Sequence, residues 1–293
     1  MRNRILTLLL LITGHTVNGQ TAEWWQQNVN WDGTTHWSRY IITSPKYLGP
    51  NALTVPFINN GSIDTLNSIG ISANGHFSNG DNTQNITLYG NYAPKAGGIA
   101  INAQFIPYEH YTMSHDVKTK RKTFFENYND RQCAGDVLVN TTVQLFQKKR
   151  DKIQLALRLG LRMPAGGDLA TARYADVPGY WIDIGGGIPF KNRVFKWLGM
   201  LGFYVWQTND DKHRQDDAIL FGSGFEWSQH GWRIQAYATG YSGYKNNGDR
   251  PVLVRLGTEK ILHQKIYVIR LQQGLHDFAY SSVEAGIKFV LGK

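Results

Sequence analysis

The stretch KIQLALRLGLRM, from Lys152 to Met163, decides the fold because apolar and polar residues alternate along it with a period of two. One face of an extended chain here carries Ile153, Leu155, Leu157, Leu159, Leu161 and Met163, and the other carries Gln154, Ala156, Arg158, Gly160 and Arg162. An apolar face of this length is what a β-strand needs to cross a membrane. The end of the chain repeats the pattern, with Val283, Ala285, Ile287, Phe289 and Leu291 alternating with Ser282, Glu284, Gly286 and Lys288.

The first nineteen residues have the pattern of an exported protein. Arg2 and Arg4 precede an apolar run from Ile5 to Ile12, and a small residue, Gly19, stands at the end of the segment. Residues 1–19 are therefore predicted to be a secretory signal peptide. No later stretch offers the about 20 apolar residues of a transmembrane helix.

Composition excludes several classes of function. The formal net charge is +9, but the basic residues are spread along the chain, and together with the export signal this argues against a nucleic-acid partner. Cys133 is the single cysteine, so no intramolecular disulfide is possible. No spacing of His, Cys, Asp or Glu suggests a metal site, and no motif suggests a cofactor.

The mature chain divides into a lead-in and a repetitive β region. Residues 20–64 are rich in Trp and turn residues and poorly periodic, which indicates a periplasmic or lumen-contacting segment. Residues 65–293 are predicted to form an all-β, transmembrane antiparallel β-barrel of about twelve strands. The expected strands are 66–78, 84–93, 98–110, 135–147, 152–163, 179–188, 196–206, 217–228, 231–241, 251–262, 264–273 and 281–291.

The connections between these strands fall into two alternating classes. Short turns are expected at 94–97, 147–151, 190–195, 228–231 and 263, and longer polar loops at 114–134, 164–178, 207–216, 242–250 and 273–280. Short turns at one end and long loops at the other are typical of an outer-membrane barrel whose C-terminus is periplasmic. A soluble β-sandwich, the alternative, gives no reason for this segregation.

Aromatic residues gather near the strand ends, where an interfacial girdle would lie. The members are Tyr92, Tyr180, Trp181, Trp197, Trp206, Trp227, Trp232 and Tyr267. The strand at 196–206 is apolar on both faces, so the pattern does not orient it.

Two segments resemble known outer-membrane proteins. Glu284, Gly286, Phe289 and Leu291 resemble the signal on the last strand that the barrel assembly machinery recognises, although Gly292 and Lys293 follow it. Residues 135–167 resemble a hairpin of the barrel transporters grouped as the MetA-pathway of phenol degradation family, and the N-terminal segment is similar to outer-membrane proteins of Bacteroidetes. These resemblances imply an outer-membrane location and a transport role, with no solute identified.

If the Leu-rich faces meet lipid, the opposite residues point into the lumen. The charged members of that set are Arg158, Arg162, Arg233, Arg255, Arg270, Lys288, Asp136, Asp183, Glu226, Glu259 and Glu284. Such groups would line a water path for a small solute through a narrow or gated channel. Alternatively, they pair across the lumen and close it.

The predicted loop at 114–134 carries Lys118, Lys120, Arg121 and Lys122. On the outer face of the membrane this cluster could contact lipid or lipopolysaccharide phosphates, although such a run is more often a solvated loop.

Two further functions remain open beside passage of a solute. One is a non-transporting barrel that serves as a structural element or as an interaction surface through its outer loops. The other is a barrel lipid hydrolase or deacylase, for which His76 and Ser78 have the spacing of a base and nucleophile. Their strand places both side chains inside, and the sequence offers no third residue to orient His76, so an enzyme is not expected.

Overall fold

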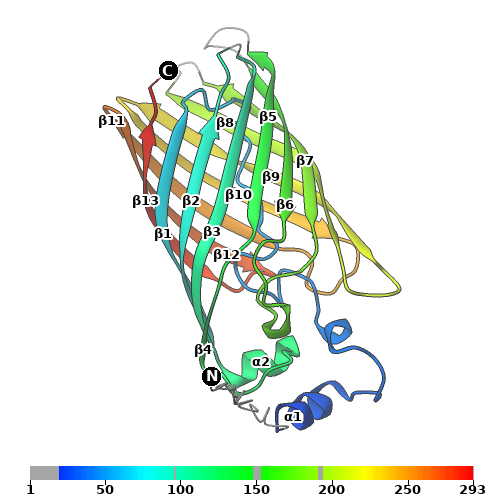
Figure 1. The fold of residues 1–293 in the computed structure, drawn as a ribbon. Coiled ribbons are helices and arrows are strands. Elements are labelled where there is room, and N and C mark those ends of the chain that lie inside the picture. The colour runs from blue at the N-terminus through cyan, green and yellow to red at the C-terminus, as the bar shows by residue number, and fades with distance from the viewer. Residues whose placement is uncertain (1–19, 96, 148–152, 191–193, 293) are drawn as a thin grey trace, which may run out of the picture.

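The computed structural model describes residues 20–95, 97–147, 153–190 and 194–292, and the predicted signal peptide lies outside them. An antiparallel sheet dominates this part of the chain (Figure 1). Its strands are β1 (Ser68–Ser78), β2 (Asp81–Tyr92), β3 (Ile99–Met113), β4 (Asp130–Cys133), β5 (Val137–Gln147), β6 (Gln154–Met163), β7 (Gly179–Pro189), β8 (Phe195–Gln207), β9 (Gln215–Gln229), β10 (Trp232–Gly243), β11 (Val252–Leu262), β12 (Lys265–His276) and β13 (Ser281–Val290). No helix among the described residues is long and apolar enough to cross a membrane.

The sheet closes on itself into a barrel of twelve strands. Apart from β4, each strand pairs with the next one along the chain, so that β3 pairs with β5, and β1 closes the ring by pairing with both β2 and β13, with Ser68 opposite Val290. The four-residue β4 is an addition to the end of β3 and not a member of the ring. The predicted all-β barrel of about twelve antiparallel strands is therefore confirmed.

Alternation along the strands separates an apolar outer face from a polar inner one, as predicted. In β6, Arg158 and Arg162 are buried, whereas Leu159 and Leu161 are exposed. Other strands repeat this pattern, and their exposed apolar residues include Ile69, Ile71, Ile182, Ile184, Val254, Leu256, Ile269, Leu271, Val283 and Phe289. An exposed apolar belt around the whole ring is a surface for hydrocarbon and not for water.

Strand β8, which the sequence did not orient, turns its even-numbered residues inward. Leu198 and Tyr204 are fully buried, whereas Leu201 is 65% exposed. The predicted aromatic girdle is wrong at two positions, because Trp181 of β7 and Trp206 of β8 are buried in the interior. The remaining members are exposed or half-buried on the outer face of the barrel: Tyr92, Tyr180, Trp197, Trp227, Trp232 and Tyr267.

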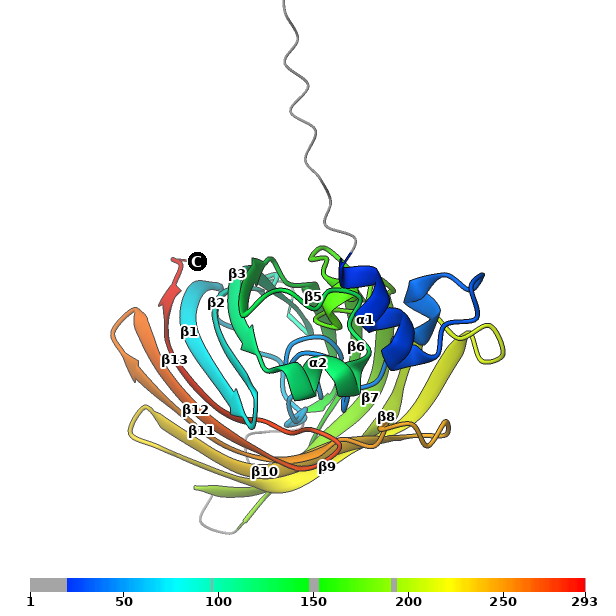
Figure 2. The same ribbon diagram turned by 90° about the horizontal axis from the view of Figure 1, so that it is seen from below.

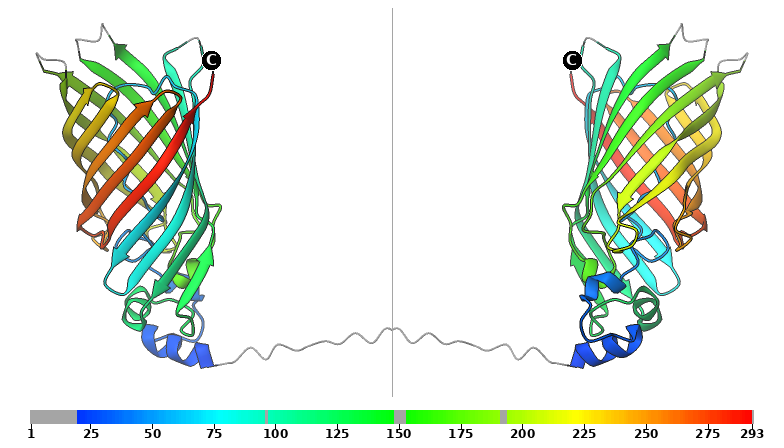
Figure 3. Two further views of the ribbon diagram at one scale, coloured as in Figure 1. Left: turned by 90° about the vertical axis from the view of Figure 1, so that its left-hand side faces the viewer. Right: turned by 90° about the vertical axis from the view of Figure 1, so that its right-hand side faces the viewer.

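The two ends of the barrel differ. Helices α1 (Gln20–Val29) and α2 (His115–Arg121) and the short helices η1 (Trp37–Tyr40) and η2 (Leu169–Thr171) cluster at the long-loop end (Figures 1 and 3). The predicted loop 114–134 thus contains α2 and β4. The C-terminus lies at the opposite, short-turn end. If the C-terminus is periplasmic, as the sequence predicts, α1 lies on the outer side of the membrane.

Residues 41–63, called here the lumen segment, run through the bore from the long-loop end to the short-turn end. Near its start, Lys46 N donates to Gly248 O in a long loop; near its end, Ile63 N donates to Gln144 Oε1 of β5. Figure 2, which views the barrel along its bore, shows this blue trace inside the ring. The chain then enters β1 at the short-turn end.

Candidate functional site: a filled bore with two cavities

Three arginine-to-carbonyl bonds hold the middle of the lumen segment. Arg255 donates from Nη2 to Val55 O at 2.7 Å and from Nη1 to Pro56 O at 3.1 Å. Arg158 donates from Nη2 to Phe57 O at 2.9 Å. Charge-assisted bonds of this kind are about twice as strong as neutral ones. The segment is therefore docked on the wall and does not merely cross the bore.

A run of glycines in β7 makes room for the end of the segment. A Cβ atom on Gly185 would collide with Asn59, and one on Gly187 would lie 2.7 Å from Asn60 O. Asn59 then reaches β7 itself, donating from Nδ2 to Asp183 Oδ1 at 2.9 Å. Glycine inside a strand marks a close backbone approach, and here the approaching backbone is the lumen segment.

All eleven charged residues predicted to face the lumen are buried or half-buried, and most are paired. The ion pairs are Arg158–Asp183 at 2.8 Å, Arg162–Asp136 at 2.7 Å, Arg233–Glu259 at 3.1 Å, Arg270–Glu284 at 2.8 Å, Lys288–Glu259 at 3.0 Å and, with a residue outside the predicted set, Lys196–Glu226 at 3.1 Å. These charges therefore pair along the barrel wall, between adjacent strands or, for Lys288 and Glu259, between β13 and β11, and they do not close the lumen by pairing across it. Arg255 differs, since its partners are the lumen-segment carbonyls, Thr239 and Gln272.

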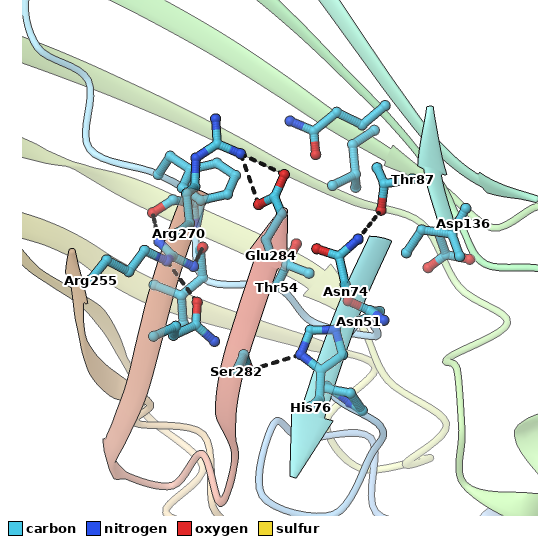
Figure 4. Close-up of a pocket in the computed structure, with 18 of the residues that line it drawn as sticks. Asn51, Thr54, Asn74, His76, Thr87, Asp136, Arg255, Arg270, Ser282 and Glu284 are labelled. Carbon is cyan, nitrogen blue, oxygen red and sulfur yellow. Dashed lines mark hydrogen bonds and ion pairs between the residues drawn. The ribbon is translucent and has the colours of Figure 1, made fainter. Parts of the chain in front are cut away.

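Two cavities lie beside the lumen segment. The first, of about 130 Å³, lies in the middle of the barrel (Figure 4) and is lined by apolar side chains such as Val55 and Phe278 together with polar ones such as Asn74. The second, of about 270 Å³, is more polar and lies toward the short-turn end, where Lys196 and Lys288 line it. The first is suited to a mixed, amphipathic guest and the second to water and ions.

Six residues line both cavities and form the boundary between them, called here the neck: Phe57, Tyr89, Gln104, Asn140, Arg158 and Arg270. Phe57 is the neck residue that belongs to the lumen segment. Its ring lies 4.4 Å from the Arg255 guanidinium carbon and 5.0 Å from that of Arg270. Each such cation–π contact contributes about 0.5–2 kcal/mol. The ring is therefore held in place between the cavities.

A buried charge network closes the long-loop end. Arg173, from the loop between β6 and β7, is fully buried and donates to Asp81 Oδ1 at 3.1 Å and to Glu109 Oε1 at 2.5 Å. Arg121 of α2 binds the other Asp81 oxygen at 2.7 Å. Burial would lower the pKa of Arg173, but the two carboxylates more than offset it and hold that pKa well above its usual value. The loop is thereby fixed to the barrel wall.

An aromatic cluster fills the bore on the side of β7 to β10. It consists of Trp181, Tyr204, Trp206 and Tyr241, with ring centroids 5.0–5.5 Å apart in the contacting pairs. Tyr241 donates its hydroxyl to Leu53 O at 2.9 Å, which attaches the cluster to the lumen segment. Together with the Arg173 network, these rings leave the long-loop end packed and the short-turn end more open.

The four cations predicted to contact surface anions do not form one patch. Lys118 is buried and donates to the carbonyls of Glu126, at 2.7 Å, and Tyr128. Burial lowers the pKa of its ammonium group. Arg121 is buried in the Asp81 network, which leaves Lys120 exposed and Lys122 half-buried. The sequence does not reveal that the four cations are separated, because helix α2 turns Lys118 and Arg121 toward the barrel.

His76 faces the first cavity, but its hydrogen-bond partners do not include Ser78, the predicted partner. His76 Nδ1 lies 2.8 Å from Ser282 Oγ, and Nε2 lies 3.0 Å from Asn85 Oδ1 (Figure 4 shows the Ser282 contact). Ser78 instead donates to Asp81 O. Since Asn85 Oδ1 can only accept, Nε2 carries the proton and Nδ1 accepts from Ser282. The register brings His76 directly opposite Ser282, across the seam of β1 and β13.

No protein-family model and no curated protein matches the chain. Among solved structures, it is similar to the COG4313 outer membrane channel from Pseudomonas putida F1, with a TM-score of 0.60, 11% identity and coverage of 81% of this chain and 100% of that one. Weaker similarities include the translocator domain of the autotransporter NalP from Neisseria meningitidis (TM-score 0.45, 12% identity, 78% and 90% covered) and a mutant of the monoaromatic hydrocarbon channel TodX (0.41, 9%, 78% and 90%).

At such low identity, the similarity to the first of these structures shows the fold alone. The fold is that of an outer-membrane β-barrel, which confirms the coarser part of the expectation drawn from the sequence resemblances. Membership of the phenol-degradation family and an origin in Bacteroidetes stay predictions.

Proposed function

We propose that this protein is a gated outer-membrane channel for a small amphipathic solute, and that the lumen segment is its gate. The observation that carries the proposal is the neck, where a single ring on the lumen segment, Phe57, separates a polar cavity from a mixed one. A solute that enters from the short-turn end meets the polar cavity first. It reaches the middle of the barrel when Phe57 leaves its place between Arg255 and Arg270.

The lumen segment can move without unfolding of the barrel strands. The interior ion pairs join neighbouring strands to one another, so they stay intact when the lumen segment shifts. The segment has no regular secondary structure from residue 52 to the start of β1, and its bonds to the wall are individual side-chain contacts. The shared fold with a protein described as an outer membrane channel is consistent with this proposal.

Phe57→Ala tests the gate. Removal of the ring takes away both cation–π contacts and widens the neck, so we expect a higher potassium chloride conductance in planar bilayers than the unaltered protein shows. Phe203→Ala is the matched control, because Phe203 is an exposed phenylalanine on the outer face of β8. Equal conductance of both variants and the unaltered protein, each correctly folded, would refute a gate at the neck and favour the non-transporting barrel.

Ester hydrolysis in the first cavity is a second candidate function, which the Ser282–His76–Asn85 array favours. Ser282 Oγ would attack the ester carbonyl and pass its proton to His76 Nδ1, which would return it to the departing alkoxide. Water would then attack the acyl-serine and release the carboxylic acid. Gln272 of β12 stands opposite Ser282, and its amide oxygen accepts a hydrogen bond from Arg255. Its amide nitrogen takes no part in that bond and is the candidate hydrogen-bond donor to the oxyanion.

A chromogenic short-chain ester tests this second function. If it operates, Ser282→Ala abolishes turnover, whereas Ser78→Ala, on the same side of the barrel but bonded to Asp81 O, leaves it unchanged. Absence of turnover in the unaltered protein would exclude the hydrolase for esters of this size. In that case the array is a structural link across the β1–β13 seam.

A further inference from the structure

Arg255 of β11 is a buried cation of the bore without an ion-pair partner. Ten of the eleven charged residues predicted to face the lumen form ion pairs, whereas among the described residues no carboxylate lies within ion-pair distance of Arg255. Glu284 lines the same cavity, but both of its oxygens accept from Arg270. A buried charge without a countercharge is unfavourable, so Arg255 is suited to a negatively charged guest.

Two carbonyl groups of the lumen segment occupy the edge of Arg255 to which a carboxylate would bind. Val55 O lies 2.7 Å from Nη2, and Pro56 O, on the next residue, lies 3.1 Å from Nη1. A carboxylate offers two oxygens to the same two nitrogens in the bidentate arrangement that arginine favours. Because a carboxylate carries a full negative charge and a carbonyl oxygen a partial one, the carboxylate is the stronger partner.

The first cavity leaves room beside this guanidinium group for a small apolar body. Arg255 lies at one edge of the cavity (Figure 4), whose lining includes the apolar side chains of Leu271, Phe278 and Val283. The volume of about 130 Å³ restricts the guest to a short molecule. A guest that suits both features has one negatively charged end and a short apolar body.

The second cavity, which a solute from the short-turn end meets first, favours anions. The cations that line it are Arg158, Lys196, Arg233, Arg270 and Lys288. Among the described lining residues, the carboxylates are Asp64 and Glu226. The other ion-pair partners of these cations, Asp183, Glu259 and Glu284, do not line this cavity. A cavity whose surface carries more cations than anions concentrates anions from solution.

We propose that the solute is a small monocarboxylate with a short apolar body, and that its carboxylate replaces the carbonyl oxygens of Val55 and Pro56 on Arg255. This inference rests on the proposed channel, because it names the solute of that channel. Arg255 also contacts the ring of Phe57. The exchange of partners on Arg255 therefore releases the lumen segment at the neck, and the solute opens its own gate.

Binding of hexanoate to the protein in detergent, measured by calorimetry at pH 7, tests the site. Hexanoate is ionised at this pH, and hexanamide has the same apolar body without the charge. A charge-assisted bidentate contact predicts that hexanoate binds at least about tenfold more tightly than hexanamide. Equal binding of the two compounds, or no binding of hexanoate, would overturn the proposal.

Arg255→Gln locates the site. A glutamine amide keeps a donor for one carbonyl of the lumen segment but removes the charge, so we expect a folded barrel whose hexanoate affinity falls at least about tenfold. Arg214→Gln is the matched control and should bind hexanoate like the unaltered protein, since Arg214 is exposed in the loop before β9. Undiminished binding in Arg255→Gln would overturn the proposal by placing the carboxylate elsewhere.

Conductance separates a failure of this inference from a failure of the channel. Hexanoate should raise the potassium chloride conductance of the unaltered protein several-fold in planar bilayers, and hexanamide should not. If Phe57→Ala conducts but hexanoate has no effect on the unaltered protein, release of the gate by a carboxylate is refuted and the channel stands. If hexanoate binds at Arg255 but Phe57→Ala does not conduct, the channel is refuted and the carboxylate site stands.

Discussion

Gly185→Val will open the barrel. Residue 185 faces the bore, and any side chain there collides with Asn59 of the lumen segment. Overpacking of this kind costs about 1–3 kcal/mol, which corresponds to a roughly 5- to 150-fold change in the ratio of open to closed states. We therefore expect a higher conductance in planar bilayers and faster swelling of vesicles in a small permeant solute.

Gly186→Val is the matched control for this variant. Gly186 lies on the same strand but faces outward, and a Cβ atom there meets nothing closer than 3.7 Å. The control should therefore retain the closed barrel. Both variants should keep the gel mobility of a folded barrel before heating. If the two substitutions change conductance equally, displacement of the lumen segment is not the cause.

Arg173→Leu will have the largest effect on stability. The substitution leaves Asp81 and Glu109 buried with much of their positive countercharge removed. Breaking a buried pair in this way costs about 3–5 kcal/mol. The free energy of unfolding in urea, measured with the protein in lipid vesicles, should fall by that amount.

Arg39→Leu provides the comparison for Arg173→Leu. Arg39 also pairs with a carboxylate, Asp211 at 3.0 Å, but the two side chains are 42% and 66% exposed. An exposed pair contributes about 0–1 kcal/mol. Similar losses for both variants would contradict the interpretation of the Arg173 network as the closure of the long-loop end.

The barrel was predictable because lipid imposes a simple rule on every strand. The alternation around Leu159 needs no knowledge of tertiary structure, and the short turns and long loops follow from the same architecture. Strand β8 does not alternate between apolar and polar residues, because its inner face packs against aromatic rings of other strands and not against water. Trp206 therefore resembled a girdle residue in the sequence while lying in the bore.

The contents of the bore were much less predictable. The residues predicted to line the lumen are buried or half-buried, but their ion-pair partners depend on register between strands, which a sequence does not state. The glycines at 185–187 were the available signal for the lumen segment, since three in one strand indicate close approach of another backbone. Arg173 had no such signal, because an arginine in a long polar loop is usually solvated.

Reactivity of a cysteine at residue 55 tests the filled bore most directly. Val55 is buried in the middle of the lumen segment, and replacing Cys133 by Ser leaves the new thiol as the single one in the chain. In reconstituted protein, Val55→Cys should resist a water-soluble maleimide that rapidly labels Thr34→Cys, and the additional change Gly185→Val should remove that protection. Equally rapid labelling at both positions without Gly185→Val would show that the segment does not lie in the bore.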